Sequence, residues 1–115
     1  MRVLVCGGRD YEDRETLERV LDTIPITTLI VGDARGADAL ARSYGHRKQG
    51  IAQISMYGAD WAKHGKMAGP IRNKQMLRCG DPELVVAFPG GKGTANMVTQ
   101  ARKAGVKVRQ IEAIL

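Results

Sequence analysis

The chain has 115 residues, of which 43% are hydrophobic, and a formal net charge of +6. This length fits one domain with a core large enough to need no disulfide or metal staple. No apolar run is long enough to span a bilayer, and the short apolar run after Arg2 is unlike a signal peptide. These features predict a single cytoplasmic domain over residues 1–115 with no membrane partner.

The cysteine and histidine content favours neither metal nor redox chemistry. Cys6 and Cys79 are far apart in the chain and form no metal-binding or redox spacing. His64 has no second histidine or cysteine nearby, so we predict no metal site. We interpret Cys6, at the end of an apolar run, as a buried reduced thiol.

Charge is distributed unevenly along the chain. Residues 1–60 carry 8 basic and 9 acidic side chains, whereas residues 61–115 carry 10 basic and 3 acidic ones. No acidic residue occurs between Trp61 and Gly80. Such a basic segment attracts anions, either the phosphates of a small ligand or a nucleic-acid backbone, unless it is only a solubilising surface.

The first half of the chain alternates apolar runs with an amphipathic segment. Val3–Cys6 is wholly apolar, which is typical of a strand buried on both faces. Apolar residues recur at helical spacing from Leu17 to Ile24, and Pro25 helps to end that helix. A second strand over 29–31, a second helix over 36–48 and a third strand over 51–57 are expected to follow.

The second half continues this alternation. A loop is predicted from Gly58 to Ala68, and Pro70 is expected at the start of a third helix that ends at Gly80. A strand over 84–88, a helix that ends near 103 and a strand over 106–111 complete the pattern. Alternating strands and helices predict an α/β fold, a Rossmann-like three-layer sandwich with a five-stranded parallel sheet.

Three predicted strands lead directly into glycine-containing loops, which a parallel sheet brings to one edge. Ligands of such sheets bind at the carboxyl ends of the strands, where strand order reverses. Glycine allows close approach to the backbone, and the N-terminus of the following helix offers N–H groups to a phosphate. The predicted ligand-binding residues are Gly7, Gly8, Arg9, Gly32, Arg35, Gly36, Asp38, Arg72, Asn73, Pro89, Gly90, Gly91, Lys92, Gly93 and Thr94.

The loop over 89–94 is the most informative of the three. Its spacing matches neither the P-loop nor the dinucleotide fingerprint. The alternative to a phosphate site is a tight turn with Thr94 as the helix N-cap.

Other candidate side chains each have two interpretations. Arg72 and Asn73 are expected in the first turn of the third helix. Arg72 either binds a phosphate or is a surface arginine. Trp61 stacks on a base or covers the edge of the core, and we favour the core. Asp33 and Asp38 receive ribose hydroxyls, or Asp38 caps its helix.

Five motifs occur in an order that resembles a known family. They are Val-Cys-Gly-Gly-Arg-Asp-Tyr at 5–11, Ile-Val-Gly-Asp-Ala-Arg-Gly-Ala-Asp at 30–38, Ala-Asp-Trp at 59–61, Ala-Gly-Pro-Ile-Arg-Asn at 68–73 and Ala-Phe-Pro-Gly-Gly-Lys-Gly-Thr-Ala at 87–95. The chain resembles the YspA-type branch of the SLOG superfamily, which also includes LOG phosphoribohydrolases and DprA proteins. The resemblance implies a Rossmann-like fold and a nucleotide-derived ligand at these loops, and it leads us to expect a homodimer.

One position departs from the LOG pattern. The glutamate of Pro-Gly-Gly-x-Gly-Thr-x-x-Glu, which acts with an arginine in cleaving the N-glycosidic bond, corresponds here to Met97, which cannot transfer a proton. Arg72 falls where the LOG arginine stands. The resemblance therefore implies that phosphate and ribose binding is retained while the known catalytic carboxylate is missing. Another acid or base would be needed for cleavage, and the candidates are Asp10, Asp33 and Asp38.

Three functions follow from this reading. We favour a module that binds, and so senses or sequesters, a phosphorylated nucleotide or nucleotide-derived ligand, with no other cofactor. The first alternative is a hydrolase of nucleotide N-glycosidic or phosphate linkages. The second is a DprA-like binder of single-stranded nucleic acid, which the basic half favours but the scarcity of aromatic side chains does not.

Overall fold

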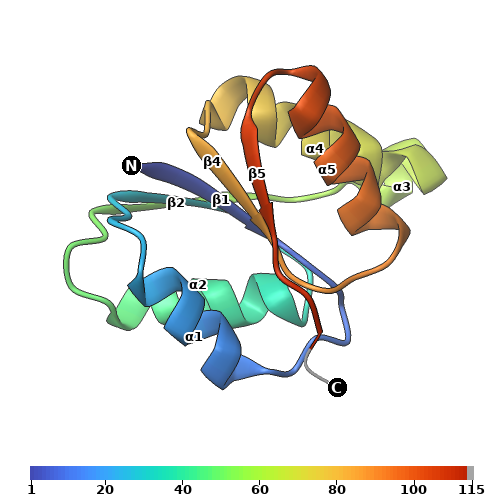
Figure 1. The fold of residues 1–115 in the computed structure, drawn as a ribbon. Helices are drawn as coiled ribbons and strands as arrows, with labels where there is room; N and C mark the ends of the chain where they lie inside the picture. The colour runs from blue at the N-terminus through green and yellow to red at the C-terminus, as the bar shows by residue number, and fades with distance from the viewer. Residues whose placement is uncertain (114–115) are drawn as a thin grey trace.

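The computed structural model describes residues 1–113, so the predicted domain extends two residues beyond the described part. Strands and helices alternate along the chain as the sequence predicts (Figure 1). The strands are β1 (Arg2–Cys6), β2 (Thr28–Gly32), β3 (Gln53–Tyr57), β4 (Leu84–Ala87) and β5 (Lys107–Gln110). The helices are α1 (Arg14–Asp22), α2 (Ala37–Arg47), α3 (Trp61–His64), the 3₁₀ turn η1 (Gly65–Met67), α4 (Ala68–Gly80) and α5 (Lys92–Lys103).

The five strands form one all-parallel sheet in the order β3-β2-β1-β4-β5. Helices α1 and α2 cover one face, and α4 and α5 cover the other (Figure 1). The predicted α/β class and three-layer Rossmann-like architecture are therefore confirmed. The direction of winding reverses between β1 and β4, which are neighbours in the sheet although far apart in sequence.

Two apolar layers hold the helices onto the sheet. Val3 and Val5 face the layer that α1 and α2 cover, whereas Leu4 and Cys6 face the layer under α4 and α5. Residues 3–6 are all buried because β1 is central and covered on both sides. Burying a Val or Leu side chain contributes roughly 1.5–3 kcal/mol, so β1 anchors the loop that follows it.

The segment predicted as a loop over 58–68 contains helical turns instead. The Asp60 carboxylate accepts a hydrogen bond from the N–H of Lys63 at 3.1 Å and so caps α3. Gly65, with φ of +56°, ends α3 and begins η1, which leads straight into α4. Pro70 is therefore the third residue of α4 rather than its first, where its missing N–H is still tolerated.

Three further details differ from the sequence analysis, one of them the alternative interpretation of Thr94. Because α4 begins at Ala68, Arg72 and Asn73 lie in its second turn, so the side chains and not the helix N–H groups face any ligand. Thr94 is not an N-cap: α5 begins at Lys92 with Gly91 as its cap residue, and no side chain caps it. The helix over Leu17–Ile24 does form, but α1 ends at Asp22.

Candidate functional site

The loops after β1 and β4 meet where the winding of the sheet reverses. The N–H of Gly8 donates a hydrogen bond to the carbonyl oxygen of Pro89 at 2.9 Å. A Cβ on Gly90 would lie 2.7 Å from the Gly8 nitrogen, so the two backbones approach too closely for a side chain there. This contact fixes the two loops relative to each other and leaves a hollow beside them.

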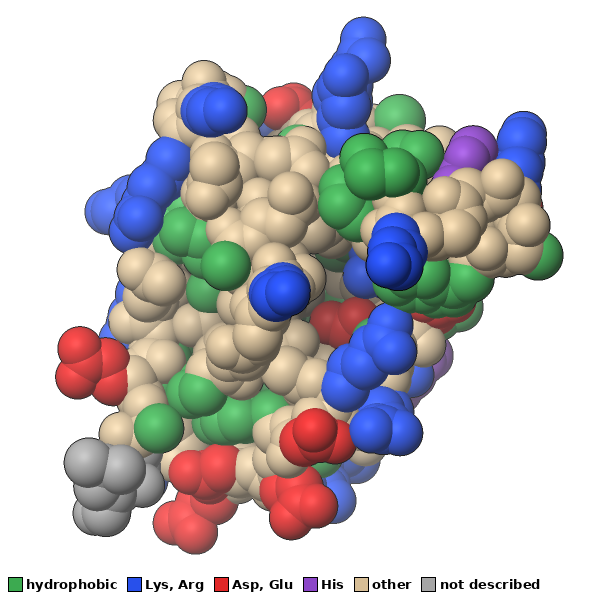
Figure 2. All heavy atoms as spheres, turned by 90° about the vertical axis from the view of Figure 1, so that its right-hand side faces the viewer, with side chains coloured by type: hydrophobic (Ala, Val, Ile, Leu, Met, Phe, Trp, Pro, Cys, Tyr) green, Lys and Arg blue, Asp and Glu red, His purple; other side chains and the backbone are tan. Residues whose placement is uncertain are grey.

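A cavity of about 390 Å³ lies between these loops, the start of α2 and the side of α4. Figure 2 views this edge of the sheet, where Lys and Arg side chains flank a hollow and acidic atoms lie inside it. Most of the predicted residues line the cavity. They are Gly7, Gly8, Arg9, Gly32, Asp38, Arg72, Asn73, Gly91, Lys92, Gly93 and Thr94.

The other predicted residues lie around the cavity rather than in its wall. Asp33 and Arg35 line a neighbouring depression that shares Arg9, Trp61 and Arg72 with the cavity. Gly36 packs against the backbone of the first loop, and Pro89 and Gly90 form the contact with Gly8 described above. The cavity wall also contains Asp10 and Trp61, which the sequence analysis named as candidates, and four residues that it did not place in a site, namely Cys6, Ala34, Gly69 and Met76.

Arg72 is the inner cation of the cavity, with a side chain only 13% exposed. Its Nη1 lies 3.4 Å from the Asp33 carboxylate, and its Nε donates to the Asn73 side-chain oxygen at 3.2 Å. A Cβ on Gly32 would lie 2.6 Å from that same Nη1, so the absence of a side chain there makes room for the guanidinium. Arg72 is therefore held in one orientation, as a specific anion contact requires.

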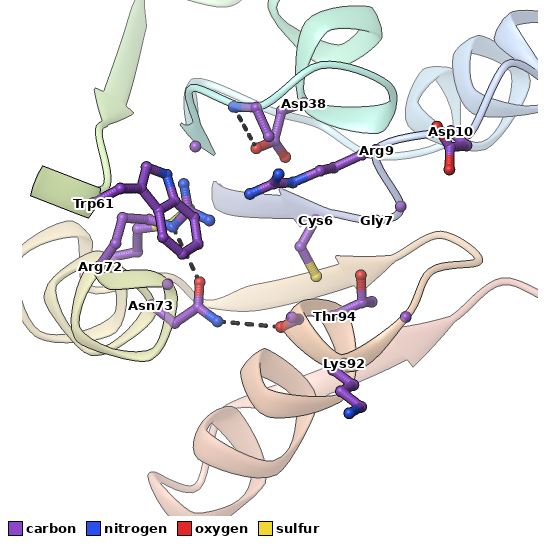
Figure 3. Close-up of a pocket in the computed structure, with 17 residues that line it drawn as sticks. Cys6, Gly7, Arg9, Asp10, Asp38, Trp61, Arg72, Asn73, Lys92 and Thr94 are labelled. Atoms are coloured by element: carbon purple, nitrogen blue, oxygen red, sulfur yellow. Dashed lines mark hydrogen bonds between the residues drawn. The ribbon is translucent and has the colours of Figure 1, made fainter. Parts of the chain in front are cut away.

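Asn73 joins α4 to the start of α5. Its buried side-chain nitrogen donates to the Gly93 carbonyl oxygen at 3.2 Å (Figure 3) and to the Asn96 side-chain oxygen at 3.1 Å. The Asn96 oxygen also accepts a hydrogen bond from Gln100 at 2.7 Å. With its oxygen engaged by Arg72, Asn73 positions both the guanidinium and the first turn of α5.

Asp38 places a buried carboxyl group in the cavity wall. It is the second residue of α2 and does not cap it; its Oδ2 accepts from the N–H of Ala34 at 3.2 Å. Burial raises the pKa of Asp38 to about 6, although Arg72, the Ala34 N–H and Arg42 act in the opposite direction. The carboxyl group therefore exchanges its proton close to neutral pH.

Cys6 also lines the cavity, but its thiol has low reactivity. Its side chain is buried, as predicted. Burial, followed by the nearby Asp38 carboxylate, raises the pKa of the thiol to about 12. The thiolate needed for nucleophilic attack or metal binding is therefore scarce at neutral pH.

The first turn of α5 faces the cavity with free backbone groups. The N–H groups of Lys92, Gly93 and Thr94 have no acceptor within residues 1–113. Neither Gly91 nor Gly93 has a positive φ, and a Cβ at either position would meet no atom of the described chain within 4 Å. The Lys92 side chain extends away from Arg72 (Figure 3), so residue 92 offers its amide rather than its ammonium group.

The interpretation of Trp61 as cover for the core is wrong. Its side chain is 48% exposed and belongs to neither apolar layer. It lines the cavity instead, with the Arg9 guanidinium carbon 5.2 Å from the centre of a ring. The rest of the basic segment lies elsewhere: among the basic residues from 61 to 80, only Arg72 lines the cavity, and Lys63, Lys66, Lys74 and Arg78 are exposed.

Met97 does not line the cavity but is buried in the layer that contains Leu4 and Met76. A carboxylate at this position would be desolvated by that layer. No group of three or more His, Cys, Asp or Glu side chains within residues 1–113 is arranged to hold a metal ion. None of the helices described is long and apolar enough to cross a membrane.

The fold and the position of the cavity define an α/β protein of the Rossmann-like class with its cavity at the reversal point of the sheet. A family model described as "YspA, cpYpsA-related SLOG family" matches residues 1–64. The chain is also similar to the Gene 61 protein of Mycobacterium phage D29. The alignment of 117 residues, gaps included, has 39% identity and covers 93% of each chain. The chain belongs to the YspA, cpYpsA-related SLOG family, and this membership suggests binding or processing of nucleotide-related molecules.

Proposed function

We propose that the cavity binds a phosphorylated nucleotide or nucleotide-derived ligand, and that the protein senses or sequesters it. The phosphate lies against the N–H groups of Lys92, Gly93 and Thr94, where the dipole of α5 favours a negative charge. Arg72 contributes the charged contact from the other side of the cavity. Family membership supports a nucleotide-related ligand.

One observation carries this proposal: no contact within the described chain requires glycine at positions 91 and 93. Neither has a positive φ, and both have open space where a side chain would stand. Both also line the cavity beside backbone N–H groups that have no acceptor in the described chain. Their missing side chains keep that space open, which is what a ligand in contact with the backbone requires.

A thermal-shift measurement with the common ribonucleoside 5′-monophosphates tests the proposal. We expect at least one of them to raise the Tm of the parent protein, because a ligand that binds only the folded state stabilises it. Gly91→Val and Arg72→Ala should each abolish that rise. Arg78→Ala serves as the matched control, because it removes an exposed guanidinium of α4 that lies outside the cavity. Equal rises in all four proteins would overturn the proposed site.

Hydrolysis of an N-glycosidic or phosphate linkage in the same ligand is a second candidate function, and Asp38 favours it. A carboxyl group with a pKa of about 6 in a cavity wall is suited to donate a proton to a leaving group. Chromatography of a nucleotide incubated with the protein would detect a released base or phosphate. Product formation that Asp38→Asn abolishes, while the thermal shift persists, would establish hydrolysis. A thermal shift without any product would leave binding alone.

A further inference from the structure

Trp61 is the only tryptophan of the chain, and its position is not explained by packing. It is the first residue of α3, a helix with no buried residue. Its ring lies beside Gly69, where a Cβ would come within 3.4 Å of it, and about half of the side chain is exposed. Exposing so much apolar area forgoes hydrophobic stabilisation. The ring lines the same cavity as the α5 amides and Arg72.

The guanidinium of Arg9 lies over this ring and has no other partner among the described residues. Its carbon is 5.2 Å from the ring centre, and its side chain forms neither an ion pair nor a hydrogen bond with residues 1–113. Figure 3 shows the side chain reaching across the cavity towards Trp61. The neighbouring arginines differ in this respect, because Arg72 pairs with Asp33, and Arg35 pairs with Asp10.

The contact between Arg9 and Trp61 is easily exchanged. An exposed cation–π pair contributes only about 0.5–1 kcal/mol. Arg9 lines the cavity and also the two depressions beside it, so its side chain has room to move. An aromatic base can replace the guanidinium on the indole, and the guanidinium can then pair with an anionic group of the same ligand.

We propose that Trp61 is the stacking platform for the aromatic base of the ligand, and that Arg9 moves from the indole to the ligand's phosphate when the base binds. This inference rests on the proposed function and extends it, because it assigns the ligand a flat aromatic base beside its phosphate. Arg9 and Trp61 thereby recognise different parts of one molecule. Trp61 stacks on the base, and Arg9 pairs with the phosphate.

Ligands that differ only in the base separate these roles. The probes are the four common ribonucleoside 5′-monophosphates and ribose 5-phosphate, with affinities measured by calorimetry. We expect at least one nucleotide to bind the parent at least tenfold more tightly than ribose 5-phosphate. Trp61→Ala should remove that difference without changing the affinity for ribose 5-phosphate, and Trp61→Phe should keep most of it. Arg9→Ala should weaken both kinds of probe.

Two readouts guard against an indirect effect of these substitutions. Because Trp61 is the only tryptophan, its fluorescence reports on this site alone, and we expect the nucleotide, but not ribose 5-phosphate, to quench it. Met67→Ala is the matched control, since it removes another exposed apolar side chain, 59% exposed, from the adjacent turn outside the cavity. It should leave both affinities unchanged, and far-UV circular dichroism should show that every variant is folded.

The possible failures are distinguishable. If ribose 5-phosphate and a nucleotide bind the parent equally, or if Trp61→Ala leaves their affinity ratio unchanged, the stacking role is overturned while the phosphate site stands. If Arg9→Ala weakens neither probe, the movement of Arg9 is overturned. If no probe binds, the proposed function fails, and the stacking role fails with it.

Discussion

Helices α2 and α5 begin in the same way but differ in what their first amides contact. Each follows a strand, has a glycine as its cap residue and lacks a side-chain cap. At α2 the N–H of Ala37 donates to the carbonyl oxygen of Gly8 at 3.1 Å, so another loop of the protein occupies the helix start. At α5 the first three amides face the cavity without an acceptor in the described chain. Similar loops thus hold the fold together at one helix and leave a site open at the other.

The two cap glycines should respond differently to substitution, and this is the largest effect that we expect. Gly36 has φ of +74°, and a Cβ there would overlap the carbonyl of Gly8 and the backbone of Arg9. Gly36→Ala should therefore lower the free energy of unfolding by roughly 3 kcal/mol or more, as measured by urea denaturation. Gly91→Ala should lower it by no more than about 1 kcal/mol, because alanine is a poorer N-cap than glycine but its Cβ meets no atom of the described chain.

A third glycine separates the steric clash from the backbone strain in the stability lost by Gly36→Ala. Gly105 has φ of +76° but open space around it, so Gly105→Ala adds backbone strain without a clash. Its cost should be about 1 kcal/mol. If Gly36→Ala costs no more than this, the contact with the first loop does not hold the start of α2.

The buried carboxyl group of α2 should make stability depend on pH. The pKa of Asp38 is near 3.8 without perturbation and about 6 in the folded protein, so folding favours the protonated form. This stabilisation is complete below pH 4 and is lost as pH rises to about 6. We expect the free energy of unfolding of the parent to fall by roughly 2–3 kcal/mol relative to Asp38→Asn over this range.

Urea denaturation at several pH values would measure this difference. Asp10→Asn removes an exposed carboxylate at the same cavity and should keep the pH profile of the parent. Parallel profiles for the parent and Asp38→Asn would mean that burial does not perturb this carboxyl group.

A smaller effect is expected at the link between α4 and the open start of α5. Asn73→Ala removes the side chain that hydrogen-bonds to the Gly93 carbonyl oxygen, the Asn96 side-chain oxygen and the Arg72 guanidinium. The free energy of unfolding should fall by about 1–3 kcal/mol, and the nucleotide-induced rise in Tm should shrink. Gln75→Ala, at an exposed position of the same helix, should change neither quantity. A loss of stability with an unaltered ligand response would limit Asn73 to a structural role.

The sequence predicts the framework of the site better than its details. Buried apolar runs and regularly placed glycines are local signals, and a parallel sheet necessarily brings the loops after its strands to one edge. The first turn of α5 and Arg72 could therefore be expected beside one cavity. Whether these residues bind a ligand stays a prediction.

The details that sequence analysis misses depend on distances between remote segments. Gly36 and Gly91 have the same local pattern, and only the position of the first loop distinguishes them. The burial of Asp38 depends on what packs around it, and the link through Asn73 depends on how α4 lies beside α5. The indole of Trp61 turns towards the cavity because a short helix replaces the predicted loop.

The strand order affects how the chain folds during its synthesis. Val3 pairs with Leu29 on one side and with Leu84 on the other, so β1 lacks its second partner during synthesis until β4 has been made. Until then one edge of β1 is open, and Leu4 and Ile30 lack the cover of α4 and α5. Such a nascent chain exposes an unpaired edge beside apolar side chains, which is the form most prone to aggregate and to engage chaperones.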